Sequence, residues 1–589
     1  MKSRLAFIGF FLCGGIFPAS ASLNLDSPYG IGSDRIVEFA ADEGWTVVSQ
    51  QLTNKAFDAY ENGEKTAVNW YYLSRWADLL ASNEGDVVSK WIDAIDKAKL
   101  GHKNMAQRYT LYKRPLNSHF SLSLQKVLLG DFAFSREFFD LLSPYDYLPG
   151  VLQTLNHLHG KNRKYFYEYR RLALAIAVVY DVPPPPGWPH FQVPDSILPR
   201  ELPDIDTAFD YWVDLNERGQ CPFDLSKMSV EELKFIVDTP AMDDFQWVQE
   251  NIHNKPDKFA DVYGRINYRF DRVMNNQFIW RGKDYQLKTI LNYGGICVDQ
   301  AYFAAQAGKA KGIPTLVFRG AGMDGRHAWF GFMPDEGVWE FNGGREGDNR
   351  YVTGYAHDPQ TWANITDHQL QFLGERFHHS YYYQKSLLHA NFANRYLEHN
   401  DPVSAQEVAE NALRFEKRNQ IAWEALYSAT GLLSDDPRET EKVLRRAAQA
   451  FRYNPDLETY YLNRVIKNLE NRGEGSRAQR EKYLLTIKNK GDRKDISIQQ
   501  AADRLLENMA DDPLAARLRY FRVILLQLGK VGGIDVYDRI VMPFVQQLTA
   551  SGYKREAYQM LVYAREKFDA RSGSMLDLEL KRQLNIYKP

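Results

Sequence analysis

Cys297, His327 and Asn342 are residues whose types and order suit acyl transfer. A cysteine attacks an amide carbonyl when a nearby base takes its proton, and the product is an acyl-thioester. An imidazole serves as such a base when a third polar group orients its ring. The three residues therefore predict a nucleophile, a base and an orienting group. Glu340 is the alternative orienting group, because it lies two residues before Asn342 and faces the same side of an extended strand.

The sequence around Cys297 favours a tight turn followed by a helix. Gly294 and Gly295 permit the turn. Residues 297–311 are mostly good helix formers with a small apolar face. At a helix N-terminus the unpaired N–H groups and the helix dipole favour a thiolate. The same N–H groups suit the oxyanion of a tetrahedral intermediate. We therefore expect Cys297 to have a lowered pKa.

Three β-like runs follow this helix, at residues 315–319, 327–333 and 338–341. The first comes directly after Gly312-Ile313-Pro314, which ends the helix. A helix followed by antiparallel strands predicts an α+β domain, which we place at residues 204–380. In this arrangement His327 lies on the second strand and Asn342 follows the third.

The ordered motifs Gly-x-Cys, Gly-Ile-Pro, His-Ala-Trp and Trp-x-x-Asn span about residues 230–345. Together they resemble the transglutaminase-like superfamily, which is related in fold to papain-type cysteine proteases. The resemblance implies a core in which a helix packs on an antiparallel sheet. It also implies a Cys-His-Asp triad that begins with Cys297 and His327. Asn342 stands where the superfamily more often has Asp, although papain-like enzymes use Asn in this role.

The resemblance further implies that a side chain just before the nucleophile helps to bind the oxyanion. Tyr293 and Asn292 are the two candidates for this role, and Gly295 is expected to line the site. Trp329 matches a position that packs beside the site.

Helical segments are expected on both sides of this domain. Residues 22–182 predict an N-terminal helical domain, and the prolines of residues 183–203 predict a stiff linker. Residues 381–589 predict a tetratricopeptide-like helical domain, because similar segments recur with an offset of 35 residues (454 − 419). Such arrays often present a concave surface, so we expect this one to bind a protein partner.

Composition and the N-terminus limit the function classes. The net charge of −2 argues against a nucleic-acid binder with a broad basic surface. No motif for a metal or a cofactor is found, so neither is predicted. Lys2 and Arg4, the apolar run 5–17 and Ala19-Ser20-Ala21 predict a signal peptide over residues 1–21. We therefore expect a periplasmic or extracellular protein that retains no integral membrane segment.

These observations predict an exported cysteine enzyme that acts on amide bonds of peptide or protein substrates. Hydrolysis, as in a peptidase or amidase, is the first expectation, because cross-linking needs a further site that excludes water and admits an amine. A protein cross-linking transferase is one alternative. An inactive scaffold that binds a peptide in the groove and on the helical repeats is the other. Cys221 has no visible partner in the sequence.

Overall fold

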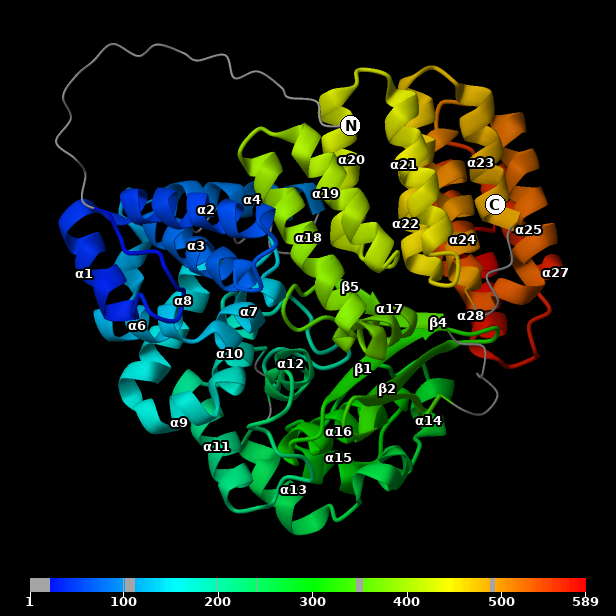
Figure 1. Ribbon diagram of the computed structural model, residues 1–589. Helices are drawn as coiled ribbons and strands as arrows, with labels where there is room; N and C mark the ends of the chain where they lie inside the picture. The colour runs from blue at the N-terminus through cyan, green and yellow to red at the C-terminus, as the bar shows by residue number, and fades with distance from the viewer. Residues whose placement is uncertain are drawn as a thin grey trace. The chain divides into compact units, whose positions relative to one another are not determined.

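The structure is a computed structural model that describes residues 22–98, 100, 112–198, 200–240, 242–345, 353–487 and 493–588. The predicted signal peptide, residues 1–21, lies outside the described residues. The described chain is mostly helical and contains one five-stranded antiparallel sheet (Figure 1). It is therefore a mixed fold of helices and strands, as expected. No helix in the described ranges has the length and apolar character needed to cross a membrane.

The described residues form two compact units. The first contains residues 22–87 and 112–140, and the second contains residues 88–98 and 141–588. The division differs from the domain boundary predicted at residue 182, because residues 141–182 belong to the second unit. The helical period alone did not reveal this division.

The first unit is helical and has an aromatic core. Its Trp76 is fully buried, donates from Nε1 to Ser135 Oγ at 2.8 Å and packs on Phe138. One helix of this unit ends at Ala81, and the next begins at Glu84. The helices that lie in this unit or begin in it are α1 (Ser33–Glu43), α2 (Trp45–Glu61), α3 (Ala67–Ala81), α4 (Glu84–Ala98), η1 (Leu116–His119), α6 (Leu122–Gly130) and α7 (Phe132–Leu141).

The proline-rich segment 183–203 is part of the second unit and is not an exposed spacer. Trp188, His190, Val193 and Leu198 are all buried. The guanidinium group of Arg200 donates to the backbone carbonyls of Trp188, His190 and Val193 at 2.7–2.8 Å. These contacts hold the segment in a fixed path, so the linker role predicted for it does not describe this structure.

The sheet has the strand order β3-β2-β1-β4-β5, and all neighbours are antiparallel. Its strands are β1 (Thr315–Ala321), β2 (Arg326–Asp335), β3 (Val338–Gly343), β4 (Thr353–His357) and β5 (Asn364–Thr366). The three strands predicted from the sequence are confirmed as β1, β2 and β3. The predicted helix after Cys297 is confirmed as α16 (Cys297–Ala310), which packs against β1 and β2.

Other helices of the second unit precede the sheet or follow it closely. They are α8 (Leu148–Lys161), α9 (Arg163–Glu168), α10 (Arg170–Val179), α11 (Ile205–Glu217), α12 (Val230–Val237), η2 (Met242–Asp244), α13 (Phe245–Asn251), η3 (Pro256–Arg265), α14 (Phe270–Met274), α15 (Leu287–Tyr293), α17 (Asp367–Leu373) and η4 (Arg376–His379).

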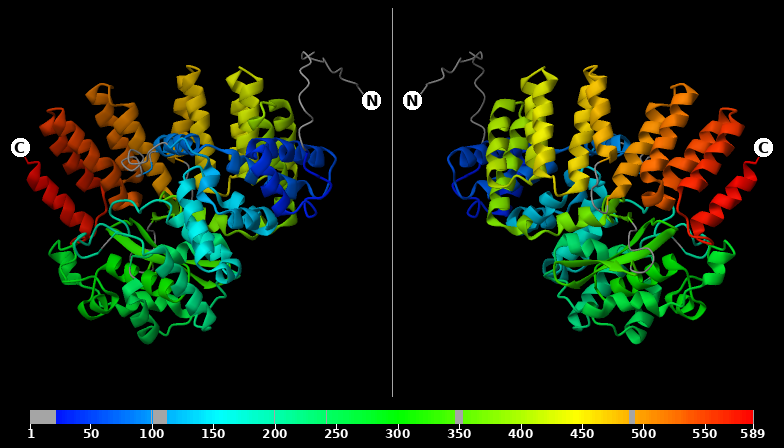
Figure 2. Two further views of the ribbon diagram at one scale, coloured as in Figure 1. Left: turned by 90° about the vertical axis from the view of Figure 1, so that its left-hand side faces the viewer. Right: turned by 90° about the vertical axis from the view of Figure 1, so that its right-hand side faces the viewer.

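The remainder of the second unit is a row of antiparallel helices (Figure 2). Asn419 and Asn454, which revealed the repeat, are the N-caps of α20 (Gln420–Leu433) and α22 (Pro455–Asn471). The small residues Ala409 and Ala412 and the large Trp423 are all buried, on two neighbouring helices that pack together. The row comprises α18 (Tyr381–Glu398), α19 (Pro402–Phe415), α20 (Gln420–Leu433), α21 (Pro437–Ala450), α22 (Pro455–Asn471), α23 (Gly475–Ile487), α24 (Lys494–Asp503), η5 (Arg504–Asn508), α25 (Leu514–Val536), η6 (Tyr537–Val541), α26 (Met542–Ala550), α27 (Lys554–Lys567) and α28 (Met575–Ile586).

Candidate active site

Two glycines and an aspartate fix Cys297 at the first position of α16. Gly294 has φ 72°, and a Cβ atom there would lie 2.6 Å from the carbonyl oxygen of Asn267. A Cβ atom on Gly295 would lie 2.4 Å from Cβ of Asp299. The missing side chain allows Asp299 Oδ2 to accept a hydrogen bond from the backbone N–H of Ile296 at 2.8 Å. This bond caps the helix, and so the predicted turn-then-helix arrangement is confirmed.

Asp299 is also the centre of a buried polar network beneath the site. Arg272 Nη1 donates to Asp299 Oδ2 at 2.7 Å, and the Tyr285 hydroxyl donates to Oδ1 at 2.7 Å. His190 Nε2 lies 3.0 Å from the same hydroxyl. Because the tyrosine proton goes to Asp299, the histidine N–H must be the donor in this last contact. The network therefore ties the proline-rich segment to the start of α16.

His190 is expected to make stability fall in mild acid. Burial lowers its pKa to about 3 in the folded protein, while an unfolded histidine has a pKa of about 6.5. Between these values only the unfolded state takes up the proton, so the stability present above pH 6.5 is lost as the pH falls. The loss is about 1.4 kcal/mol per pH unit, or roughly 2 kcal/mol at pH 5.

Urea unfolding at pH 7 and pH 5 measures this contribution. The free energy of unfolding is expected to fall less between pH 7 and pH 5 in His190→Gln than in the wild type, whatever the stability of the variant at pH 7. His253→Gln, at an exposed position, is the matched control and is expected to keep the wild-type loss. An unchanged loss in His190→Gln would contradict the assignment.

The thiol of Cys297 is half-buried and lines a cavity. Burial raises its pKa to about 11. The backbone amides of Ala328, Val298 and Cys297 itself act in the opposite direction and lower this pKa, but burial outweighs them. The lowered thiol pKa expected from the helix N-terminus is therefore wrong. The resting form at neutral pH is a protonated thiol.

His327 lies at the start of β2, next to the residue whose amide contacts the Cys297 sulfur. Its Nε2 atom is 2.7 Å from the carbonyl oxygen of Gly344. A carbonyl only accepts, so Nε2 carries the proton and Nδ1 carries the lone pair. Burial lowers the pKa of His327; Gly344 raises it and Arg345 lowers it further. The ring is therefore neutral at pH 7 and is ready to accept a proton.

A backbone carbonyl occupies the orienting position predicted for Asn342 or Glu340. Asn342 is exposed, and its Oδ1 accepts from Arg345 Nη1 at 3.5 Å. The Glu340 carboxylate accepts from the backbone N–H of Asn342 at 2.8 Å. Among the described residues, the hydrogen bond on His327 Nε2 goes to Gly344 instead. The described residues therefore do not contain the predicted pairing of His327 with Asn342 or Glu340.

Gly344 was not among the predicted site residues, although the Gly343-Gly344 pair was visible in the sequence. It has φ 80°, and a Cβ atom there would lie 2.5 Å from the Tyr263 ring. Only glycine fits both restraints, and the resulting turn directs the carbonyl towards His327. A double glycine directly after a predicted strand was the available signal.

Of the other predicted site residues, Tyr293 and Asn292 lie outside the cavity lining, whereas Trp329 packs against His327. Tyr293 is half-exposed and does not line the cavity; its ring lies under Arg269 and against Trp280. Asn292 is exposed and is likewise outside the cavity lining. Trp329 is buried and stacks on His327 with ring centroids 6.1 Å apart, as expected of a residue that packs beside the site.

Tyr268 is one of several aromatic residues that the structure places in the cavity with the thiol. Burial and the neighbouring Cys297 raise its pKa to about 12, so its hydroxyl stays protonated and can donate a hydrogen bond. Tyr268 was not identified from the sequence, because nothing in its local pattern distinguishes it from a core aromatic.

The cavity that contains Cys297 and His327 has a volume of about 670 Å³. Its walls come from three distant parts of the chain. The proline-rich segment contributes His190, Phe191 and Gln192, and the sheet contributes Arg319 and Tyr355, among others. The C-terminal helices contribute Asp535, Asp538, Arg539 and Met575. The helical row thus forms one wall of the candidate active site.

The same C-terminal helices hold the turn between β1 and β2, next to His327. Arg326 donates to Asp538 and to Glu579, each at 2.6 Å. The backbone N–H of Ile534 donates to the carbonyl of Met323 at 3.2 Å. This close approach requires Gly533, whose φ is 47° and where a Cβ atom would lie 2.0 Å from the Met323 oxygen. The helices therefore help to position the histidine strand.

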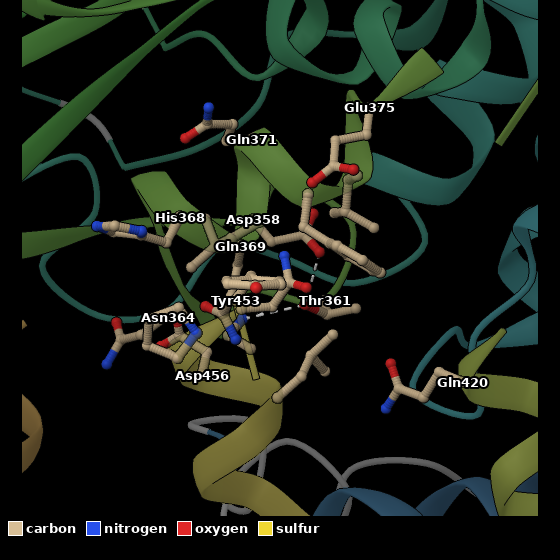
Figure 3. Close-up of a pocket in the computed structure, with 17 residues that line it drawn as sticks. Asp358, Thr361, Asn364, His368, Gln369, Gln371, Glu375, Gln420, Tyr453 and Asp456 are labelled. Atoms are coloured by element: carbon tan, nitrogen blue, oxygen red, sulfur yellow. Dashed lines mark hydrogen bonds between the residues drawn. The ribbon is translucent and has the colours of Figure 1, made fainter. Parts of the chain in front are cut away.

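A second cavity, of about 320 Å³, lies between the end of the sheet, α17 and the starts of α20 and α22 (Figure 3). Its lining combines polar and apolar side chains, and Thr361 donates to Asp358 at 3.1 Å within it. It has no cysteine among its lining residues, so it lacks the nucleophile of the first cavity. Within the described ranges, no group of three or more His, Cys, Asp or Glu side chains is arranged to hold a metal ion.

Comparisons with known proteins give no relative. No protein-family model matches the chain, and neither a curated protein nor a solved structure is significantly similar to it. The class of protein must therefore be inferred from the geometry of the site itself.

Proposed function

We propose that the protein is a cysteine amidase or peptidase with a transglutaminase-like core. The observation that carries the proposal is that a thiol at a helix start and a neutral histidine on the adjacent strand line the same cavity. The order of a nucleophile helix and three antiparallel strands supports the resemblance found in the sequence. The use of Gly344 in place of a side chain is a departure from that pattern.

The reaction begins from a neutral pair. As Cys297 Sγ bonds to the amide carbonyl carbon, His327 Nδ1 takes the thiol proton. The backbone N–H groups at the start of α16 and the Tyr268 hydroxyl donate to the developing oxyanion. The C–N bond then breaks, the imidazolium gives its proton to the leaving amine, and an acyl-thioester remains. Water attacks the thioester while His327 again takes a proton, which returns the free thiol and a carboxylic acid.

The test is an incubation of a blocked peptide-amide library with the wild type and with Cys297→Ala, in the presence and absence of a primary amine. Mass spectrometry reads the products. New carboxylic acids that form only with the wild type support hydrolysis. New secondary amides that form when the amine is present indicate a transferase. Products at equal levels with both proteins, or no products, would count against an enzyme and favour the binding scaffold.

A further inference from the structure

Three arginines line the cavity at Cys297, and two of them are already neutralised. Arg326 is held by Asp538 and Glu579. Arg539 Nε donates to Asp535 Oδ1 at 2.7 Å. The third, Arg319, projects from β1. No carboxylate among the described residues lies within ion-pair distance of Arg319. Arg319 lines the cavity, yet the proposed hydrolysis gives it no role.

The hydrogen-bond partner of Arg319 does not balance its charge. Its Nη2 atom donates to His357 Nε2 at 2.8 Å. Burial, with the charge of Arg319 as a second cause, lowers the pKa of His357 to about 4, so this imidazole accepts the bond without balancing the charge. The Tyr355 ring lies 5.9 Å from the guanidinium carbon. His190 is also near enough for the charge of Arg319 to lower its pKa.

A half-buried guanidinium without a carboxylate is costly unless a bound anion compensates its charge. The planar fork of arginine matches a carboxylate in two parallel hydrogen bonds. A single carboxylate balances the single charge of Arg319, whereas a phosphate dianion would leave one negative charge unbalanced, because the other two arginines of the cavity are already paired with carboxylates. The geometry therefore selects a monoanion among the common anionic groups.

We propose that Arg319 forms a subsite for a carboxylate of the substrate, so that the amide cleaved at Cys297 belongs to a peptide with a nearby carboxylate. The inference rests on the proposed function, because it takes the Cys297 cavity as the substrate site. The carboxylate comes either from the C-terminus of the peptide or from an acidic side chain. Both sources offer the same recognition chemistry.

The experiment measures protection of Cys297 from iodoacetamide at pH 9, which needs no turnover. The full chain is treated with matched probe pairs, and alkylation of the Cys297 peptide is followed by mass spectrometry. N-benzoylglycine against N-benzoylglycinamide tests a terminal carboxylate. N-benzoylglutamic α-amide against N-benzoylglutamine amide tests a side-chain carboxylate. The two pairs therefore distinguish the two sources.

In the wild type, at least one carboxylate probe is expected to protect at a concentration about 10- to 100-fold below that of its amide partner. Arg319→Gln is expected to bring this ratio close to one, and Arg319→Lys to keep part of it. Arg281→Gln, at an exposed position outside the cavity lining, is the matched control and is expected to keep the full ratio.

Equal protection by both members of each pair in the wild type would overturn the subsite, as would a preference that survives in Arg319→Gln. The subsite would also be overturned if neither carboxylate probe protected Cys297. Because protection is read without catalysis, a carboxylate preference in a protein that hydrolyses no peptide would retain the subsite and reject the proposed function. Hydrolysis without a carboxylate preference would retain the proposed function and reject the subsite.

Discussion

Replacing Cys297 with serine is expected to lower the rate of amide hydrolysis by about 10³-fold or more. A serine hydroxyl fills nearly the same volume but is a much weaker nucleophile. The neutral imidazole of His327 cannot compensate for the weaker nucleophile, because in the proposed mechanism it removes the proton only as the attack occurs. The measurement is kcat/KM on a peptide amide identified in the library screen, together with a thermal unfolding curve to show that the fold is retained.

Cys221→Ser is the matched control for this change. Cys221 is also a free, partly buried thiol, and burial raises its pKa to about 12. It contacts the turn at Gly312 and lies outside the cavity lining. Its replacement is expected to leave kcat/KM within about twofold of the wild type, since small surface or loop changes rarely exceed about 0.5 kcal/mol. Equal losses in the two variants would point to a structural effect.

Replacing Arg272 with methionine is expected to destabilise the second unit by about 3–5 kcal/mol, because it leaves Asp299 as a buried, unpaired carboxylate. Arg272 and Asp299 are both buried, and Arg272 also donates to the carbonyls of Gln277 and Phe278. Methionine keeps the length and the apolar contacts of the side chain but removes every one of these donors. Urea unfolding at pH 7 measures the loss.

Arg218→Met is the control for the loss of an arginine. Arg218 pairs with Asp214 at 2.8 Å, but both side chains are more than half exposed, at 63% and 56%. Exposed pairs contribute about 0–1 kcal/mol, so a small change is expected. A loss for Arg272→Met no larger than that for Arg218→Met would show that the buried network does not stabilise the start of α16.

The sequence was sufficient where local chemistry decides the structure. The glycine pair predicted the turn before Cys297, and the helix and three strands that follow were located to within a few residues. The same local view failed where distant segments meet. The four consecutive prolines at 183–186 predicted a spacer, yet the residues after them are buried against the core. Their burial depends on contacts with Tyr285 and Trp362 that no local pattern encodes.

The sequence predicted that Cys297 and His327 lie close together, but it did not predict their environment. Cys297 and His327 lie in one cavity, but the group on the imidazole is a backbone carbonyl, which carries no sequence signature of its own. The helix N-terminus was expected to lower the thiol pKa, and burial raises it instead. Burial depends on the tertiary structure around the thiol, so it was not visible from the motif.

The most direct test of the central claim, that His327 activates Cys297, is the rate of acetylation of Cys297 by p-nitrophenyl acetate at pH 7. Rapid quenching and peptide mass mapping identify the thioester in the wild type and in His327→Ala. The account predicts that Cys297 acquires an acetyl group in the wild type, and that His327→Ala slows this step by about 10²-fold or more. An equal rate in both proteins, or acetylation of Cys221 as fast as that of Cys297, would contradict it.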